Sequence, residues 1–145
     1  MFKLGFTTLL AAGLVSGLAA AQDATTYPFD GSFEDATFAV EDAIISRGLV
    51  IDYRSHVGEM LARTGADVGS DVKIFDAADV FLFCSAVLSR KMMEADPLNV
   101  AQCPYSVFVM DREGQVSVGY RHMPDGPMQE VQSFLDEIAR EVTEQ

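Results

Sequence analysis

Histidine, cysteine and basic residues are scarce in this sequence, and tryptophan is absent. The 145 residues include two histidines, two cysteines and ten basic residues, against 22 acidic residues. The formal net charge is −12. Nucleic acid phosphates and anionic membrane surfaces repel a protein of this charge, which excludes both as electrostatic binding partners. The same charge is compatible with a basic protein partner or with a metal ion.

The motifs that mark common catalytic sites are missing as well. The sequence contains no glycine-rich phosphate loop, no Gly-x-Ser-x-Gly elbow, no His-Glu-x-x-His and no Cys-x-x-Cys, with or without a following histidine. Nothing singles out two of its carboxylates as an acid and base pair. The sequence therefore predicts no catalytic residue and favours a non-catalytic or auxiliary domain.

Long apolar runs occur only near the N-terminus. Lys3 is followed by an uncharged apolar stretch over residues 4–18 and then by Ala19-Ala20-Ala21, the small-x-small pattern after which signal peptidases cut. A transmembrane helix needs about 20 apolar residues, and this stretch is shorter and interrupted by glycine. We expect residues 1–21 to be a signal peptide cleaved after Ala21, which predicts a soluble periplasmic or secreted protein with no stable membrane anchor after cleavage.

The remaining residues, 22–145, have the length of one domain with its own hydrophobic core. Lys3 leaves with the leader, so nine basic and 22 acidic residues remain and the formal charge becomes −13. In an oxidising compartment an even number of cysteines usually indicates pairing. Cys84 and Cys103 are therefore candidates for a disulfide, which would close a loop of about 20 residues and stabilise the fold by about 3 kcal/mol.

The order of apolar and turn-forming residues predicts strands alternating with helices. The first half contains an extended segment over 25–29, a helix with Ser32 as N-cap and Gly48 after its last turn, a strand over 49–56 and a short helix over 57–64. In residues 79–84 a continuous apolar run follows Asp79, which predicts a central strand buried on both faces. Residues 72–75 fit either a strand or its lead-in.

The second half predicts a helix, a hairpin and a final helix. The first helix covers 87–95 and ends at Asp96-Pro97, since the residue before proline is disfavoured in the α region. Strands over 105–110 and 115–121 are joined by a turn at 111–114. Pro127 opens the last helix, whose apolar stripe consists of Met128, Val131, Leu135, Ile138 and Val142.

A small set of side chains could hold a metal or a redox group. It consists of His56, Cys84, Cys103, His122 and Met123, whose imidazole, thiolate and thioether groups are ligands for copper and for haem iron. The two histidines each follow a predicted strand, where strand ends can meet. The alternatives stay open: the histidines can be hydrogen-bonded surface residues, and the cysteines can be a structural disulfide or two buried hydrophobic side chains.

The pattern as a whole resembles the bacterial domain-of-unknown-function family 302. The similarity covers about residues 27–142 and is carried by the capped first helix, the strand that reaches His56, the segments 80–84 and 92–97, Cys103-Pro104 and the turn at 111–114. The resemblance implies an α+β domain, with a curved, mainly antiparallel sheet and helices packed on one face in a TATA-binding-protein-like arrangement. It also implies a homodimer and, for exported members, haem or metal binding, and many members have a histidine where His56 stands.

Three functional hypotheses follow. The first is an exported domain that binds haem or copper through some of the five candidate side chains. The second is a homodimeric interaction module with a structural disulfide, whose acidic surface binds a basic protein. The third is a thiol oxidoreductase, which the wide spacing of the cysteines favours least, because closely spaced cysteines are those in which one thiol pKa is lowered.

Overall fold

Five strands form one open antiparallel sheet in the computed structural model, which describes residues 23–144. The strands are β1 (Ala24–Pro28), β2 (Ile51–Ser55), β3 (Ala77–Phe83), β4 (Tyr105–Arg112) and β5 (Gln115–Arg121), and their order across the sheet is β1-β5-β4-β3-β2. Strands β2 to β5 follow one another as a meander, while β1 pairs with β5 at the opposite edge. The predicted α+β class and antiparallel sheet are confirmed.

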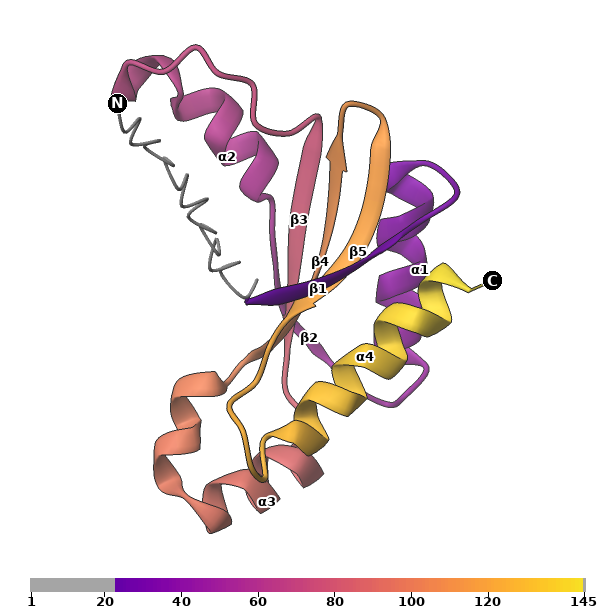
Figure 1. Ribbon diagram of the computed structural model, residues 1–145, viewed down its shortest axis with the longest axis vertical. Helices are drawn as coiled ribbons and strands as arrows, with labels where there is room; N and C mark the ends of the chain where they lie inside the picture. Colours follow the sequence, from indigo (N-terminus) through magenta and orange to yellow (C-terminus); the bar gives the residue numbers. More distant parts are fainter. Residues whose placement is uncertain (1–22, 145) are drawn as a thin grey trace, which may run out of the picture.

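Helices α1 (Phe33–Ile45) and α4 (Gln129–Thr143) cover one face of this sheet (Figure 1). The predicted start of α1 is confirmed: Ser32 Oγ accepts from the backbone N–H of Asp35 at 3.0 Å, and Asp35 Oδ2 accepts from the N–H of Ser32 at 3.3 Å. This reciprocal capping satisfies amide donors that the first helical turn leaves free. Because α1 links β1 to β2, it carries the chain across the sheet from one edge to the other.

The core lies between these two helices and the sheet. The five residues of the predicted α4 stripe are all buried, as are the side chains of alternate residues in β3, β4 and β5. Burying a large aliphatic or aromatic side chain contributes about 1.5–3 kcal/mol, so this layer is the main source of stability. Helix α4 begins at Gln129, two residues after the predicted first position at Pro127.

The opposite face of the sheet is only partly covered. Val80 and Leu82 in β3 and Phe108 and Met110 in β4 are half-buried, whereas their neighbours Phe81 and Phe83 are fully buried. Successive side chains of a strand point to opposite faces. The prediction that residues 79–84 are buried on both faces is therefore wrong for the second face, where residues 23–144 supply no helix layer that matches α1 and α4.

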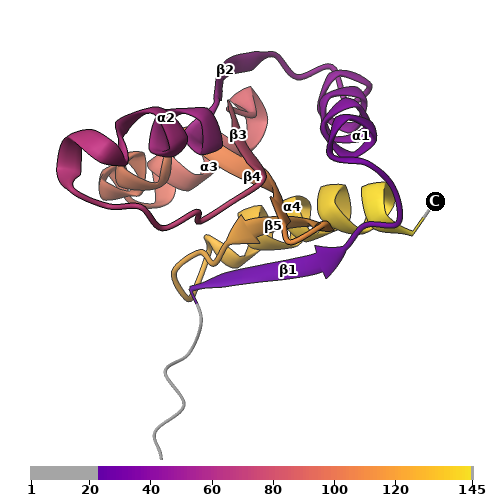
Figure 2. The same ribbon diagram turned by 90° about the horizontal axis from the view of Figure 1, so that it is seen from above.

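The remaining helices lie near the two ends of the sheet (Figure 1), and seen from above they both lie on the side of the sheet away from α1 (Figure 2). Helix α2 (Val57–Thr64) and the 3-10 turn η1 (Ala66–Val68) follow β2 at one end. Helix α3 (Ala86–Ala95) and the 3-10 helix η2 (Pro97–Gln102) connect β3 to β4 at the other. Residues 72–75 form no strand. The sequence did not predict η2, because Asp96-Pro97 ends helix α3 and also begins this 3-10 helix.

The β4–β5 hairpin has the predicted position and a two-residue turn. Glu113 and Gly114 both have positive φ, 57° and 77°, as a type I′ turn requires. Asp76 supports the turn by accepting the N–H of Glu113 at 2.6 Å. No helix within residues 23–144 is long and apolar enough to span a membrane; the predicted signal peptide and its cleavage site lie outside the described residues.

Candidate functional site

A carboxylate buried at one end of the sheet organises the first candidate site. Asp79 belongs to β3 and is only 5 % exposed. Its Oδ2 accepts from Arg54 Nε at 2.7 Å and its Oδ1 contacts His56 Nδ1 at 2.9 Å. The antiparallel pairing of β2 with β3, in which Arg54 lies opposite Phe81, brings these groups together. A buried carboxylate needs such partners, because burial of an unpaired charge is costly.

Arg54 has further contacts that fix its position. Its guanidinium carbon lies 4.9 Å from the centre of the Phe81 ring, and its Nη1 lies 3.9 Å from a carboxylate oxygen of Glu41 on α1. A guanidinium held by an aromatic face and two carboxylates has little freedom to turn away. Asp79 is therefore held in one orientation, with one oxygen directed at His56.

His56 is half-exposed, with 50 % of its side chain accessible. It precedes α2 as the N-cap residue and makes no side-chain capping bond. When the ring is neutral, a carboxylate at Nδ1 selects the tautomer that carries its proton on Nδ1. Nε2 then carries a free lone pair, and within residues 23–144 it has no hydrogen-bond partner. Such an imidazole can accept a proton or bind a metal.

His56 lies in the wall of two surface cavities. One, of about 360 Å³, is bounded by α1, α2 and the start of β3 and includes Arg54 and Asp79. The other, of about 540 Å³, lies between the end of β2 and α2 and includes Tyr53, Met60 and Arg63. The imidazole is thus accessible to a ligand bound in either cavity.

Met60 and Asp79 are residues that the sequence analysis missed. Met60 is 43 % exposed and lines the larger cavity four residues after His56. His56 directly precedes α2 and Met60 follows in the first turn of this helix, and this closeness was visible in the sequence. Asp79 had a signal too, since a carboxylate next to an apolar run of strand length is out of place unless it is paired.

The two cysteines form a second candidate site at the opposite end of the sheet. Cys84 directly follows β3 and Cys103 caps the end of η2, and their sulfur atoms are 3.4 Å apart. Both are partly buried. Cys103 also contacts Ser89 Oγ at 3.4 Å, and Ser89 donates to the hydroxyl of Tyr105 at 3.2 Å. Burial, reinforced by the adjacent Cys103 thiol, raises the pKa of Cys84 to about 11.

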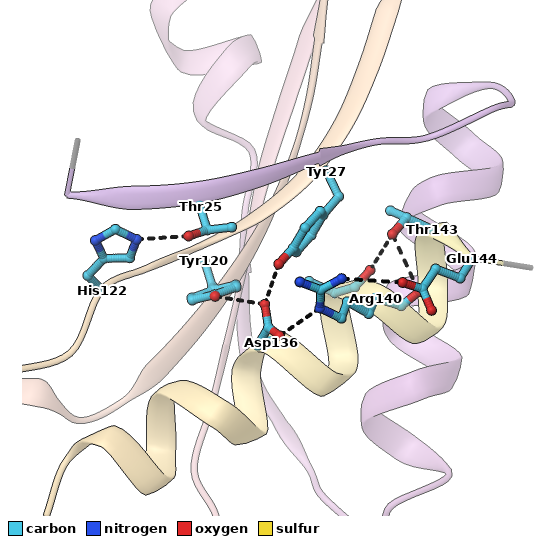
Figure 3. Close-up of polar contacts among 9 residues, drawn as sticks. Thr25, Tyr27, Tyr120, His122, Asp136, Arg140, Thr143 and Glu144 are labelled. Carbon is cyan, nitrogen blue, oxygen red and sulfur yellow. Dashed lines mark hydrogen bonds and ion pairs between the residues drawn. The ribbon is translucent and has the colours of Figure 1, made fainter. Parts of the chain in front are cut away.

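The last two candidates, His122 and Met123, follow β5. His122 Nε2 is 2.8 Å from Thr25 Oγ1 on β1, as Figure 3 shows. Met123 is 5 % exposed and belongs to the hydrophobic core, and its N–H donates to Gln132 Oε1 at 2.9 Å. A thioether packed among core side chains is in the position in which methionine fills space.

The five candidates do not form one site. Ser55, just before His56, pairs with Val80 near the start of β3, whereas Cys84 follows the end of β3. His122 follows the end of β5, and β5 is antiparallel to β4, so this end coincides with the start of β4 and not with the end of β2. The structure brings Cys84 and Cys103 together and separates both from His56.

A further polar cluster joins α4 to the sheet (Figure 3). Asp136 Oδ1 accepts from Tyr27 at 2.5 Å and from Tyr120 at 2.8 Å, and its Oδ2 accepts from Arg140 at 2.8 Å. Burial raises the pKa of Asp136, but the hydrogen bonds from Tyr27, Arg140 and Tyr120 outweigh it and hold this pKa below its usual value. With both oxygens occupied, the cluster is suited to holding α4 in place rather than to binding a ligand.

Residues 23–144 contain no group of three or more histidine, cysteine or acidic side chains arranged to hold a metal ion.

The fold and its sites define an α+β domain with an open five-stranded antiparallel sheet, two helices on one face and two separate side-chain clusters, around Asp79 and around the cysteines. Residues 25–145 match the family model of the domain of unknown function DUF302, so the chain belongs to this family, and the predicted membership is confirmed. No curated protein sequence gives a significant match.

The structural comparison agrees with this assignment. The crystal structure of an uncharacterized conserved DUF302 protein from Bacillus stearothermophilus is similar, with a TM-score of 0.59 and 17 % identity over 86 % of this chain and 92 % of that one. At this identity the similarity supports the fold alone.

Proposed function

We propose that this domain binds a redox-active metal centre, haem iron or copper, in the 540 Å³ cavity beside His56. The observation that carries the proposal is the bond between Asp79 and His56 Nδ1. Metal-binding histidines nearly always have their second ring nitrogen bonded to a carboxylate, a carbonyl or water, which orients the ring and makes the free nitrogen more basic.

The composition of the cavity wall supports the same class of ligand. His56 and Met60 line it together, and imidazole with thioether is a ligand pair found on haem iron and on copper. Haem brings four nitrogen ligands of its own, so one or two side chains suffice, and Cu(I) accepts few ligands. Arg63 lines the same cavity and could pair with a carboxylate of a bound porphyrin.

The test is a titration of purified protein with haemin and, separately, with Cu(I) in competition with a chromogenic Cu(I) chelator. The wild type and a Cys84→Ser, Cys103→Ser double variant are both used, because thiols bind Cu(I) themselves. We expect the double variant to bind one equivalent of one ligand, and the wild type to bind the same equivalent plus any Cu(I) that its thiols hold. A shifted Soret band reports haem, and loss of the coloured chelator complex reports Cu(I).

Variants at the cavity assign the site. In the cysteine-free double variant, we expect His56→Ala to abolish stoichiometric binding, and Asp79→Ala to lower affinity by about 10- to 100-fold because the ring loses its orienting partner. His122→Ala is the matched control, since it removes the other histidine, which is bonded to Thr25. The proposal fails if neither ligand binds at one equivalent, or if His56→Ala binds as the wild type does.

A further inference from the structure

The loop that contains α3 and η2 begins and ends at a cysteine. Phe83 of β3 lies opposite Tyr105 of β4 in the sheet, so the chain leaves and re-enters the sheet at adjacent positions. Cys84 directly follows Phe83, and Cys103 lies two residues before Tyr105. The pairing of the two strands therefore holds the cysteines next to each other in the folded chain.

The sulfur atoms are already in van der Waals contact at 3.4 Å. Bond formation between them needs a small side-chain movement and no change in the strands. Neither thiol is fully exposed, which limits competing reactions with large reagents. Ser89 contacts the Cys103 sulfur from α3 and also bonds Tyr105 in β4, so the surroundings of Cys103 are ordered from both sides.

We propose that Cys84 and Cys103 form a reversible disulfide that closes the α3–η2 loop at its base. The oxidant is a disulfide of low molecular weight or on a partner protein. The thiolate of Cys103 attacks it, forming a mixed disulfide and releasing one thiolate. Cys84 then gives its proton to solvent, attacks the Cys103 sulfur and displaces the second thiolate. Two protein thiols are oxidised, and the external disulfide is reduced to two thiols.

The order of the two steps follows from the environment of the Cys84 sulfur. Burial and the neighbouring thiol disfavour the thiolate of Cys84, and a thiol that resists ionisation is slow to attack an external disulfide. Once Cys103 carries the mixed disulfide, Cys84 faces a sulfur with which it is already in contact. Proximity then offsets its poor ionisation.

The bridge has a defined structural effect. The α3–η2 loop is held to the rest of the domain by the buried side chain of Met92 and by an ion pair of 2.6 Å between Lys91 and Glu130. A covalent bond at the base restricts the unfolded chain over a loop of about 20 residues, and we expect oxidation to lower the equilibrium constant for unfolding by about 100-fold.

The test uses the wild-type protein equilibrated with mixtures of reduced and oxidised glutathione, trapped with a maleimide and measured by intact mass. At low oxidised glutathione we expect the reduced protein, which takes up two maleimide groups. As oxidised glutathione rises, we expect the oxidised protein to replace it, with a mass lower by two hydrogens and no maleimide. Dithiothreitol restores the reduced protein with two reactive thiols. Two reactive thiols throughout the series, or glutathione retained on both cysteines, would overturn the proposal.

Single variants test the order. Cys84→Ser should accumulate one glutathione on Cys103 faster than Cys103→Ser does on Cys84, and the opposite ranking contradicts the assigned order. His56→Ala, at the other end of the sheet, should titrate as the wild type does. The experiment involves neither haem nor copper, so its outcome is independent of the proposed function.

Discussion

Tyr27 shows how one residue couples the sheet edge to a helix. Its hydroxyl donates to Asp136, and the guanidinium carbon of Arg140 lies 4.6 Å from the centre of its ring. The hydrogen bond to Asp136, together with burial, raises the pKa of Tyr27 to about 12. The neutral hydroxyl is the bonding form, because a phenolate beside a carboxylate is repelled.

This shift predicts a loss of stability at alkaline pH. The pKa of Tyr27 is higher in the folded than in the unfolded chain, where it is 10.0, so its contribution is complete below pH 10 and is lost as the pH rises through about 12. We expect Tyr27→Phe to cost about 1 kcal/mol at pH 7, and the difference from the wild type to shrink above pH 10.

Urea unfolding of both proteins between pH 7 and 12 measures this difference. Tyr53→Phe is the control, since Tyr53 is 62 % exposed and has no side-chain hydrogen bond among the described residues. A constant gap between the wild type and Tyr27→Phe across the series would contradict the coupling to Asp136.

At the scale of elements, Gly58 determines how closely α2 approaches the sheet. A Cβ atom at this position would lie 2.5 Å from the backbone nitrogen of Ala78 in β3, well inside van der Waals contact. Because backbone atoms form this contact, α2 would have to move. We expect Gly58→Ala to cost about 1–3 kcal/mol and to weaken ligand binding beside His56, which directly precedes α2.

Chemical denaturation and the haemin or Cu(I) titration measure the two effects. Helix propensity alone predicts the opposite sign, since alanine is favoured over glycine inside a helix by about 1 kcal/mol. A stabilised Gly58→Ala variant would therefore show that α2 does not depend on close contact with β3.

Elements defined by local signals were predictable, and those defined by neighbours were not. The N-cap at Ser32, the 113–114 turn and the apolar stripe of α4 depend on residues close in sequence, and the structure has all three. The half-buried second face of β3 depends on which helices cover the sheet. The extent of that cover is a tertiary property that alternation alone does not encode.

The candidate sites also combine features that local sequence determines with features that tertiary neighbours determine. His56 was recognised by residue type, but Asp79 lies 23 positions away and reaches it only through the β2–β3 pairing. The proximity of Cys84 and Cys103 also depends on strand pairing, here between β3 and β4. Residue type identified the reactive side chains, and the topology decided which of them meet.

For the whole molecule, the surplus of acidic residues leaves few basic groups free. Six of the nine basic residues after Lys3 form ion pairs, namely Arg47, Arg54, Lys73, Arg90, Lys91 and Arg140. Most of the 22 carboxylates therefore face solvent and have no cation partner within residues 23–144, as a basic partner would require. The predicted homodimer and basic partner remain predictions, which light scattering and salt-dependent binding can test.

The proposed disulfide depends on export, which we propose for this protein, because a disulfide persists in an oxidising compartment and is reduced in a cytosol. We predict that the exported protein begins at Gln22. Signal peptidases need small residues at the first and third positions before the cut, here Ala21 and Ala19. Replacing either with leucine should therefore block processing, whereas Ala20→Leu, at the position between them, should be processed normally.

N-terminal mass spectrometry of the exported and cell-retained fractions measures processing, and maleimide labelling of the same fractions measures the thiols. Processed protein should carry the Cys84–Cys103 bridge, and protein expressed without residues 1–21 should retain both thiols inside the cell. An exported protein that keeps Met1 would refute the cleavage site. A bridge formed equally in the retained protein would show that the cysteines, held together by β3 and β4, pair without the help of an oxidising compartment.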